Sequence, residues 1–234
     1  MDVNRLWDLI EENFFHPLNS CIGKDDSYCT MEIKKINSDL NILLENIRTS
    51  GIDSLMKRLA NPNEFAGARK ELEIASHFKR NGFVDLKLKP MNNTDIELLT
   101  NPRIYIEVYL QHYPEREKQL DKALAMGITD KKELSDEELY SLINDILDNK
   151  YKQLERKNVQ VILILDFSYS EPYERVIKNN IENFNIPDFI VCIAFITKTN
   201  IFKFNSSFTN EKVKQTLLSL LPPSDRASYL WGRN

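Results

Sequence analysis

Two predominantly apolar runs, the first of which contains only Gln160 and Asp166 as polar residues, constrain the fold of this chain more than any other feature. They cover residues 159–167 and 189–196, and both are far shorter than the roughly 18 apolar residues of a membrane-spanning helix. A continuous apolar run of this length is typical of a β-strand that is covered on both faces. A predicted helix beginning near Pro172 separates the two runs, so strands and helices alternate. The expected class is α/β, with a mixed central sheet flanked by helices and preceded by a helical extension.

Residues 63–82 are predicted to form an amphipathic helix. Apolar side chains recur in this stretch at three- and four-residue steps, and Asn81 followed by Gly82 is typical of a helix C-terminus. Glu71 lies near the edge of the apolar stripe, which places a carboxylate beside the core.

The hairpin that follows this helix brings further carboxylates together. Residues 104–111 alternate between apolar and polar side chains, so Glu107 and Tyr109 fall on the face opposite the apolar residues. Asp95 and Glu97 share one face of the preceding strand. Clustered carboxylates repel one another unless they hold a cation or a proton. The helix and the hairpin therefore predict a site for a cation.

The order of Glu71, Asp95 and Glu107 resembles that of the PD-(D/E)XK nuclease superfamily. The resemblance covers about residues 66–167 and comprises a helix with a glutamate, an aspartate on a strand and an apolar strand with a Glu-x-Lys motif. That last motif is IYIEVYLQ here, so Glu107 fits but Tyr109 stands where the family has lysine. The later sequence KYKQLERKNVQVILILDF matches a Lys-x-Gln-like helix and apolar strand of the family. The resemblance implies a restriction-endonuclease-like fold.

This resemblance also implies a divalent cation, Mg²⁺ or Mn²⁺, that supports hydrolysis of phosphodiester bonds. Asp95 and Glu107 are the expected ligands, and the main-chain carbonyl of Val108 could complete the shell. Glu71 is expected to be a further ligand, either directly or through water. The alternative for Glu71 is an ordinary acid on a charged helix surface.

Tyr109 decides whether the expected chemistry can take place. A phenol has a reference pKa near 10 and is neutral at pH 7, so it cannot replace the ammonium of lysine. Tyr109 could instead hold a water molecule or stack on a sugar or base. Lys87 and Lys89 on the neighbouring strand could supply the missing charge. Gln111 and Gln153 could orient water without a charge, which makes Gln153 a further candidate catalytic residue.

Two functions remain open at this point. The first is a Mg²⁺-dependent nuclease that acts on DNA in preference to RNA. The second is a catalytically inactive protein with the nuclease fold, serving as a nucleic-acid-binding or protein-binding scaffold. Cation binding should distinguish them, because an inactive scaffold has no reason to keep a cation site.

The net charge of −4 does not indicate a nucleic-acid-binding protein by itself. A nuclease can nevertheless be acidic overall, because only a local basic patch has to contact phosphate. Two helices offer such patches, although each of these residues taken singly also fits an ordinary solvated surface. The candidates are Arg69, Lys70, Lys79 and Arg80 on the earlier helix and Lys150, Lys152, Arg156 and Lys157 on the later one.

The expected location is the cytoplasm, without a membrane partner. The N-terminus carries acids where a signal peptide would carry bases, and three cysteines, an odd number, fit reduced thiols. A zinc site formed by His16, Cys21 and Cys29 would lack a fourth ligand and the usual paired spacing.

The sequence predicts three regions along the chain. Residues 1–62 form a helical extension, either a cap on the core or an arm for homodimerisation or substrate clamping. Residues 63–221 form the nuclease-like α/β domain, in which the charged stretch 112–134 is an insertion that could serve as a lid or partner-binding arm. A capping box at residues 135–138 begins the next helix, and residues 222–234 form a C-terminal tail.

Overall fold

The computed structural model describes residues 4–13, 16–19, 27–45, 49–89, 94–110, 134–155, 159–167 and 171–220. The chain divides into two compact units, Met1–Val108 and Tyr109–Asn234, called here the first and second unit. The predicted boundary at residue 62/63 falls inside the first unit. Of the predicted insertion at 112–134 only residue 134 is described, and the predicted tail at 222–234 lies outside the described residues.

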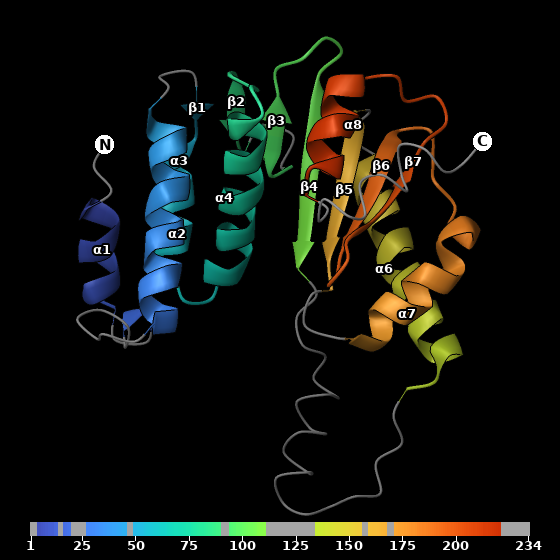
Figure 1. Ribbon diagram of the computed structural model, residues 1–234, viewed down its shortest axis with the longest axis horizontal. Coiled ribbons are helices and arrows are strands. Elements are labelled where there is room, and N and C mark those ends of the chain that lie inside the picture. Colours follow the sequence, from blue (N-terminus) through green and yellow to red (C-terminus); the bar gives the residue numbers. More distant parts are fainter. Residues whose placement is uncertain are drawn as a thin grey trace, which may run out of the picture. The chain divides into compact units, whose positions relative to one another are not determined.

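The first unit combines helices with a mixed sheet (Figure 1). Strand β1 runs parallel to β2, whereas β2, β3 and β4 are antiparallel neighbours. Helix α4 packs against both α2 and α3. The elements are α1 (Asn4–Glu11), α2 (Ser27–Leu44), β1 (Thr49–Ser50), α3 (Ile52–Leu59), α4 (Phe65–Arg80), β2 (Leu86–Leu88), β3 (Ile96–Leu98) and β4 (Ile104–Leu110).

The second unit has the same mixture of elements. Strands β5 and β6 are parallel, and β6 and β7 are antiparallel. The elements are α6 (Asp136–Glu155), β5 (Gln160–Asp166), α7 (Glu171–Asn180), the 3₁₀-helix η2 (Ile181–Asn183), β6 (Ile190–Ile196), β7 (Ile201–Phe204) and α8 (Glu211–Leu218). The two apolar runs form β5 and β6, whose apolar side chains are buried on both faces. The α/β class predicted from those runs is therefore confirmed.

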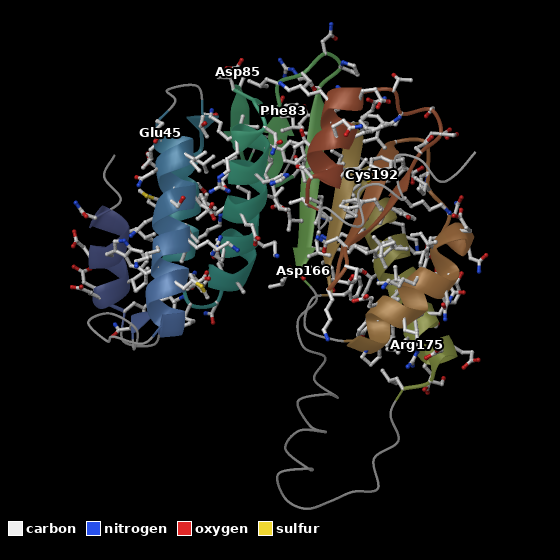
Figure 2. All side chains as sticks on the ribbon, viewed as in Figure 1. Glu45, Phe83, Asp85, Asp166, Arg175 and Cys192 are labelled. Carbon is white, nitrogen blue, oxygen red and sulfur yellow. The ribbon has the colours of Figure 1, made fainter. Side chains whose placement is uncertain are left out.

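Aromatic rings fill the core of the second unit. Phe195 of β6 packs against Phe184, with ring centroids 5.4 Å apart, and Phe167 stacks on Tyr173 at 4.9 Å. Cys192 lies in the same strand as Phe195 (Figure 2), is fully buried, and its thiol pKa is raised by that burial. A buried thiol with a raised pKa is unreactive, so Cys192 is a core residue.

The predicted capping box at the start of α6 is confirmed. The Ser135 hydroxyl accepts a hydrogen bond of 3.2 Å from the Glu138 amide, and the Glu138 carboxylate accepts one of 2.8 Å from the Ser135 amide. These reciprocal bonds satisfy amide groups that have no partner inside the helix.

A buried ion network joins α2 to α4 in the first unit. Asp39 is only 1% exposed, and its carboxylate accepts hydrogen bonds from Arg69, Ser76 and Arg80. Arg69 also contacts Glu32 at 2.6 Å. Because a buried carboxylate is stable only when it is paired, the network fixes one face of α4 against α2.

The buried ring of His16 connects the segment after α1 to the end of α3. Its Nε2 lies 2.7 Å from the Leu59 carbonyl oxygen, and its Nδ1 accepts a 3.1 Å hydrogen bond from the Leu18 amide. The Leu59 carbonyl can only accept, so Nε2 carries the proton and the ring is neutral. Both nitrogens are occupied in this arrangement, which does not favour His16 as a zinc ligand.

Within the part of the chain that the structure describes, no helix is long and apolar enough to cross a bilayer. Homodimerisation through the N-terminal helices stays a prediction.

We expect Asp39→Ala to lower the free energy of unfolding by about 3–5 kcal/mol, because it leaves the buried Arg69 without one of its two carboxylate partners. The control is Glu73→Ala, which removes ion pairs to Lys35 and Lys70 at the surface and should cost no more than about 1 kcal/mol. Urea unfolding of both variants measures the difference. Equal losses would show that the buried network contributes no more than a surface pair.

His16 should make stability depend on pH. Burial lowers the His16 pKa below 6.5, so the unfolded chain binds the proton more readily than the folded one. The neutral ring makes its full contribution to the free energy of unfolding above the ordinary histidine pKa. That contribution is lost as the pH falls through 6.5 towards the lower pKa of His16 in the folded state. Urea unfolding at pH 7.5 and 5.5 should therefore show a loss at acid pH that is reduced in His16→Leu. The same loss in both proteins would assign it to other groups.

Candidate functional site

Asp95 immediately precedes β3 and is hydrogen-bonded to β4. Its amide donates a 3.0 Å hydrogen bond to the Ile106 carbonyl, and its carboxylate Oδ2 accepts one of 2.7 Å from the Val108 amide. Asp95 therefore binds the two residues on either side of Glu107. Asp95 and Glu107 are both buried. These hydrogen bonds place the backbone of Asp95 beside that of Glu107, in agreement with the predicted proximity of the two residues.

Lys89, which follows β2, connects Asp95 to Glu71. The Lys89 amide donates a 2.8 Å hydrogen bond to the Asp95 carbonyl, and its Nζ donates to Asp95 Oδ1 and lies 3.5 Å from Glu71 Oε1. Burial by itself would lower the Lys89 pKa, but the charge of Asp95, the hydrogen bond to it and the charge of Glu71 raise that pKa above its ordinary value. Lys89 is therefore a protonated ammonium at neutral pH.

Glu71 on α4 has a second cationic partner, Arg58 on α3. The two terminal nitrogens of Arg58 lie 2.5 and 2.6 Å from the two oxygens of Glu71. Burial raises the Glu71 pKa above its usual range, and the hydrogen bonds from Arg58 partly offset this effect. Arg58, Glu71, Lys89 and Asp95 are called the charge cluster below. Its two carboxylates and two cations balance.

Gly51 allows α3 to approach the end of β2. It precedes α3 at φ 86°, and a Cβ at this position would lie 2.2 Å from the Leu88 carbonyl oxygen. Only glycine fits so close to another backbone in this conformation. Because Arg58 belongs to α3 and Lys89 follows Leu88, this contact helps to bring the two cations of the cluster near each other.

Glu97 does not belong to the charge cluster. Its Oε1 accepts hydrogen bonds from Arg103 at 3.1 Å and from the Tyr105 hydroxyl at 3.3 Å, and its register partner on β2 is Lys87. The charged residues on this face therefore separate into two groups, one at Asp95 and one at Glu97.

Tyr109 and Gln153 belong to the second unit. Tyr109 is half-buried, with Lys150 Nζ 5.2 Å from its ring centroid, and burial raises the pKa of its phenol. Gln153 is exposed on α6. Their catalytic roles stay predictions, as does coordination by the Val108 carbonyl.

The basic patch predicted on α4 is largely neutralised. Arg69 and Arg80 contact Asp39, and Lys70 lies 3.2 Å from Glu73. Lys79 donates to the Thr49 hydroxyl and the Val84 carbonyl. These side chains are thus engaged with other groups of the first unit, and their contact with phosphate stays a prediction. On the later helix Lys152 is exposed, whereas residues 156–157 lie outside the described residues.

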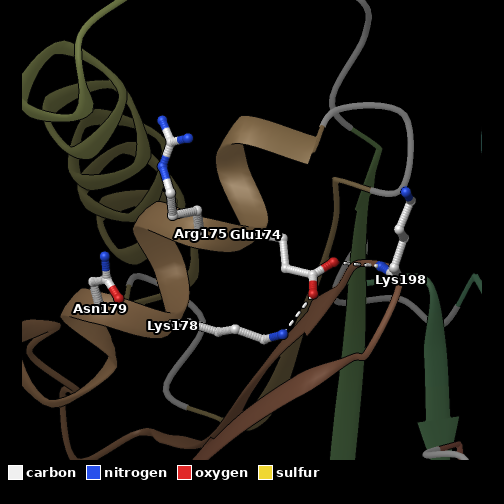
Figure 3. Close-up of a pocket in the computed structure, with 5 residues that line it drawn as sticks. All are labelled: Glu174, Arg175, Lys178, Asn179 and Lys198. Atoms are coloured by element: carbon white, nitrogen blue, oxygen red, sulfur yellow. Dashed lines mark hydrogen bonds and ion pairs between the residues drawn. The ribbon is translucent and has the colours of Figure 1, made fainter.

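A surface pocket of about 330 Å³ lies beside α7 in the second unit (Figure 3). Glu174 in this pocket accepts hydrogen bonds from Lys178 Nζ, the Thr199 hydroxyl and the Lys198 amide. Arg175 contacts Asp136 at 2.6 Å. Arg175 and Lys178 are thus each paired with an acid of the same unit.

Carboxylate oxygens are suitable ligands for Mg²⁺, and Asp95 and Glu107 provide them. Among the described residues, however, no three His, Cys, Asp or Glu side chains are grouped as a ready metal site. Asp95 Oδ1 is bound by Lys89 and Oδ2 by the Val108 amide. The donor chemistry therefore fits a divalent cation if Lys89 moves off Oδ1.

No protein-family model, curated protein or solved structure matches this chain. Sequence reasoning named Lys89 only as one of several substitutes, and it missed Arg58 because a single arginine on a short helix gives no signal.

Gly51→Ala should lower the free energy of unfolding by at least about 1–2 kcal/mol, the cost of a left-handed conformation in a residue with a Cβ. The clash with Leu88 adds to that cost. Gly67→Ala on α4 is the matched control, because a Cβ there meets nothing within 4 Å and alanine favours a helix. Urea unfolding should show a loss for the first variant and a small gain for the second. Equal behaviour would contradict the close approach.

Proposed function

We propose that this chain is a metal-dependent nuclease acting on DNA in preference to RNA, with Lys89 in the role of the family's missing lysine. One observation carries the proposal. The Lys89 ammonium contacts Asp95, and Asp95 is bound to the residues on both sides of Glu107. An ammonium next to the expected cation ligands is what the Glu-x-Lys motif would provide.

The position of Lys89 explains how the charge can come from the residue that follows β2. Its main chain is hydrogen-bonded to Asp95, so its side chain begins beside that carboxylate. A lysine stem is long and flexible, and only the place of its ammonium matters for electrostatic stabilisation. Tyr109 can then retain an uncharged side chain without loss of the cationic group.

Asp95 and Glu107 are the residues that would hold the cation. A bound Mg²⁺ would neutralise phosphate charge and favour formation of hydroxide from water. The Val108 amide orients one oxygen of Asp95. Lys89 supplies a positive charge that balances the developing charge on phosphate, and an ammonium with a reference pKa of about 10.4 does not act as a general base at neutral pH.

A specific observation also favours the scaffold function. The charges of Glu71 and Asp95 are already balanced by Arg58 and Lys89, so the folded chain has no electrostatic need for a metal ion. Under this alternative the cluster is purely structural. Addition of Mg²⁺ would then leave stability unchanged.

Cation binding separates the two functions. For a nuclease, Mg²⁺ or Mn²⁺ should raise the melting temperature of the wild type, because a ligand that binds only the folded state stabilises it. Asp95→Asn and Glu107→Gln should abolish the rise. Glu97→Gln is the matched control, since Glu97 is bound to Arg103 and Tyr105, and it should keep the rise. An equal rise in all four proteins would place the cation elsewhere.

Cleavage of plasmid DNA tests the role of Lys89. Lys89→Gln should reduce Mg²⁺-dependent cleavage by about 10²–10³-fold, the usual loss when one stabilising group is removed. Lys87→Gln, two residues away and opposite Glu97, should cleave like the wild type. Tyr109→Lys should bring little gain, because the charge is already present. A wild type that neither binds the cation nor cleaves DNA would leave the scaffold function.

A further inference from the structure

We propose that Glu71 is a positioning residue for the Lys89 ammonium and that Arg58 keeps Glu71 out of the coordination shell of the cation. The inference rests on the proposed nuclease function. It changes the role of Glu71, which the family resemblance made a candidate metal ligand.

The contact between Arg58 and Glu71 is the first reason. Both Glu71 oxygens accept hydrogen bonds from Arg58, and the two side chains are only 16% and 6% exposed. A guanidinium that binds both oxygens of a carboxylate is among the strongest side-chain pairs. Direct coordination would require Glu71 to leave Arg58 and would leave a buried cation unpaired.

The hydrogen bonds of the Arg58 side chain all go to Glu71 among the described residues. Within the described residues, its Nε is buried without a hydrogen-bond partner, so both of its hydrogen bonds go to Glu71. Helices α3 and α4, which carry the two side chains, pack against each other. The pair is therefore fixed by the helices as well as by its own charges.

The second reason is the place of Lys89 between two carboxylates. Its Nζ donates to Asp95 Oδ1 and lies 3.5 Å from Glu71 Oε1. A cation that binds Asp95 repels the ammonium from that oxygen. Glu71, whose position Arg58 maintains, is then the nearest remaining counter-charge. The ammonium consequently stays beside the cation site.

The charges support the same division of roles. Arg58 and Glu71 neutralise each other, so Lys89 and the bound cation together oppose the charges of Asp95 and Glu107 and the phosphate. If Glu71 were a ligand, Arg58 would be an additional unbalanced charge in the interior. The arrangement thus places the mobile positive charge on Lys89 and the fixed one on Arg58.

The test compares Glu71→Gln with Asp95→Asn in the full-length protein. Calorimetry with Mg²⁺ alone gives the cation affinity, and cleavage of plasmid DNA gives kcat and KM. Glutamine keeps the shape of Glu71 and one acceptor for Arg58 but removes the charge. We expect Glu71→Gln to bind Mg²⁺ like the wild type and to lose about 10²-fold in kcat, the loss that a misplacement of about 1 Å can cause. Asp95→Asn should lose the binding itself.

Arg58→Gln and the double variant Glu71→Gln/Arg58→Gln provide a second arm that does not depend on cleavage. Removing Arg58 alone leaves the buried Glu71 with only the Lys89 ammonium at 3.5 Å, whereas the double variant removes both charges. Thermal unfolding of the metal-free proteins should therefore show the double variant to be more stable than Arg58→Gln. Its Mg²⁺ affinity should again match that of the wild type.

Three results would overturn the inference and leave the proposed nuclease function intact. Loss of Mg²⁺ binding in Glu71→Gln equal to that in Asp95→Asn would make Glu71 a ligand. An unchanged kcat in Glu71→Gln would reduce the pair to a structural role. An Mg²⁺ affinity in Arg58→Gln no higher than that of the wild type would show that Arg58 does not keep Glu71 away from the cation. Wild-type protein without Mg²⁺ binding or cleavage would overturn the proposed function and this inference together.

Discussion

A carboxylate that leaves water must meet a cation or a hydrogen-bond donor, and the first unit is organised by this requirement. Helix α4 satisfies it twice. Its Arg69 and Arg80 neutralise Asp39 of α2, while its Glu71 is neutralised by Arg58 of α3 and approached by Lys89. The helix is consequently held by ion pairs to two other helices, and the carboxylate it presents to the sheet has a defined orientation.

Local sequence patterns predicted the elements of the fold and part of the site. Continuous apolar runs indicated β5 and β6, and strand alternation together with chain order indicated that Asp95 and Glu107 would be neighbours. These predictions succeed because side-chain direction follows directly from helix and strand periodicity. The sequence also indicated a charged helix surface at Arg69 and Arg80. Their pairing with Asp39, 30 and 41 residues away, has no local signature.

The charge cluster was predictable only in part, because it depends on contacts between distant segments. Arg58 reaches Glu71 through the packing of α3 on α4, and α3 reaches β2 through the contact of Gly51 with Leu88. Neither contact has a periodic pattern. Because the two cations of the charge cluster balance its two carboxylates, the fold has no electrostatic need for a metal ion. Stability and the proposed nuclease chemistry therefore require different things of the same residues.

Lys89 has a φ of 48°, a backbone conformation that glycine or asparagine adopts at lower cost. Neutral drift at this turn should therefore replace lysine whenever its charge has no use. A lineage that retains lysine here, together with a tyrosine on β4, would indicate selection for an ammonium supplied by the residue after β2 instead of by β4. Motif searches restricted to the strand of Glu107 would classify such proteins as inactive, and inspection of the turn after β2 would recover them.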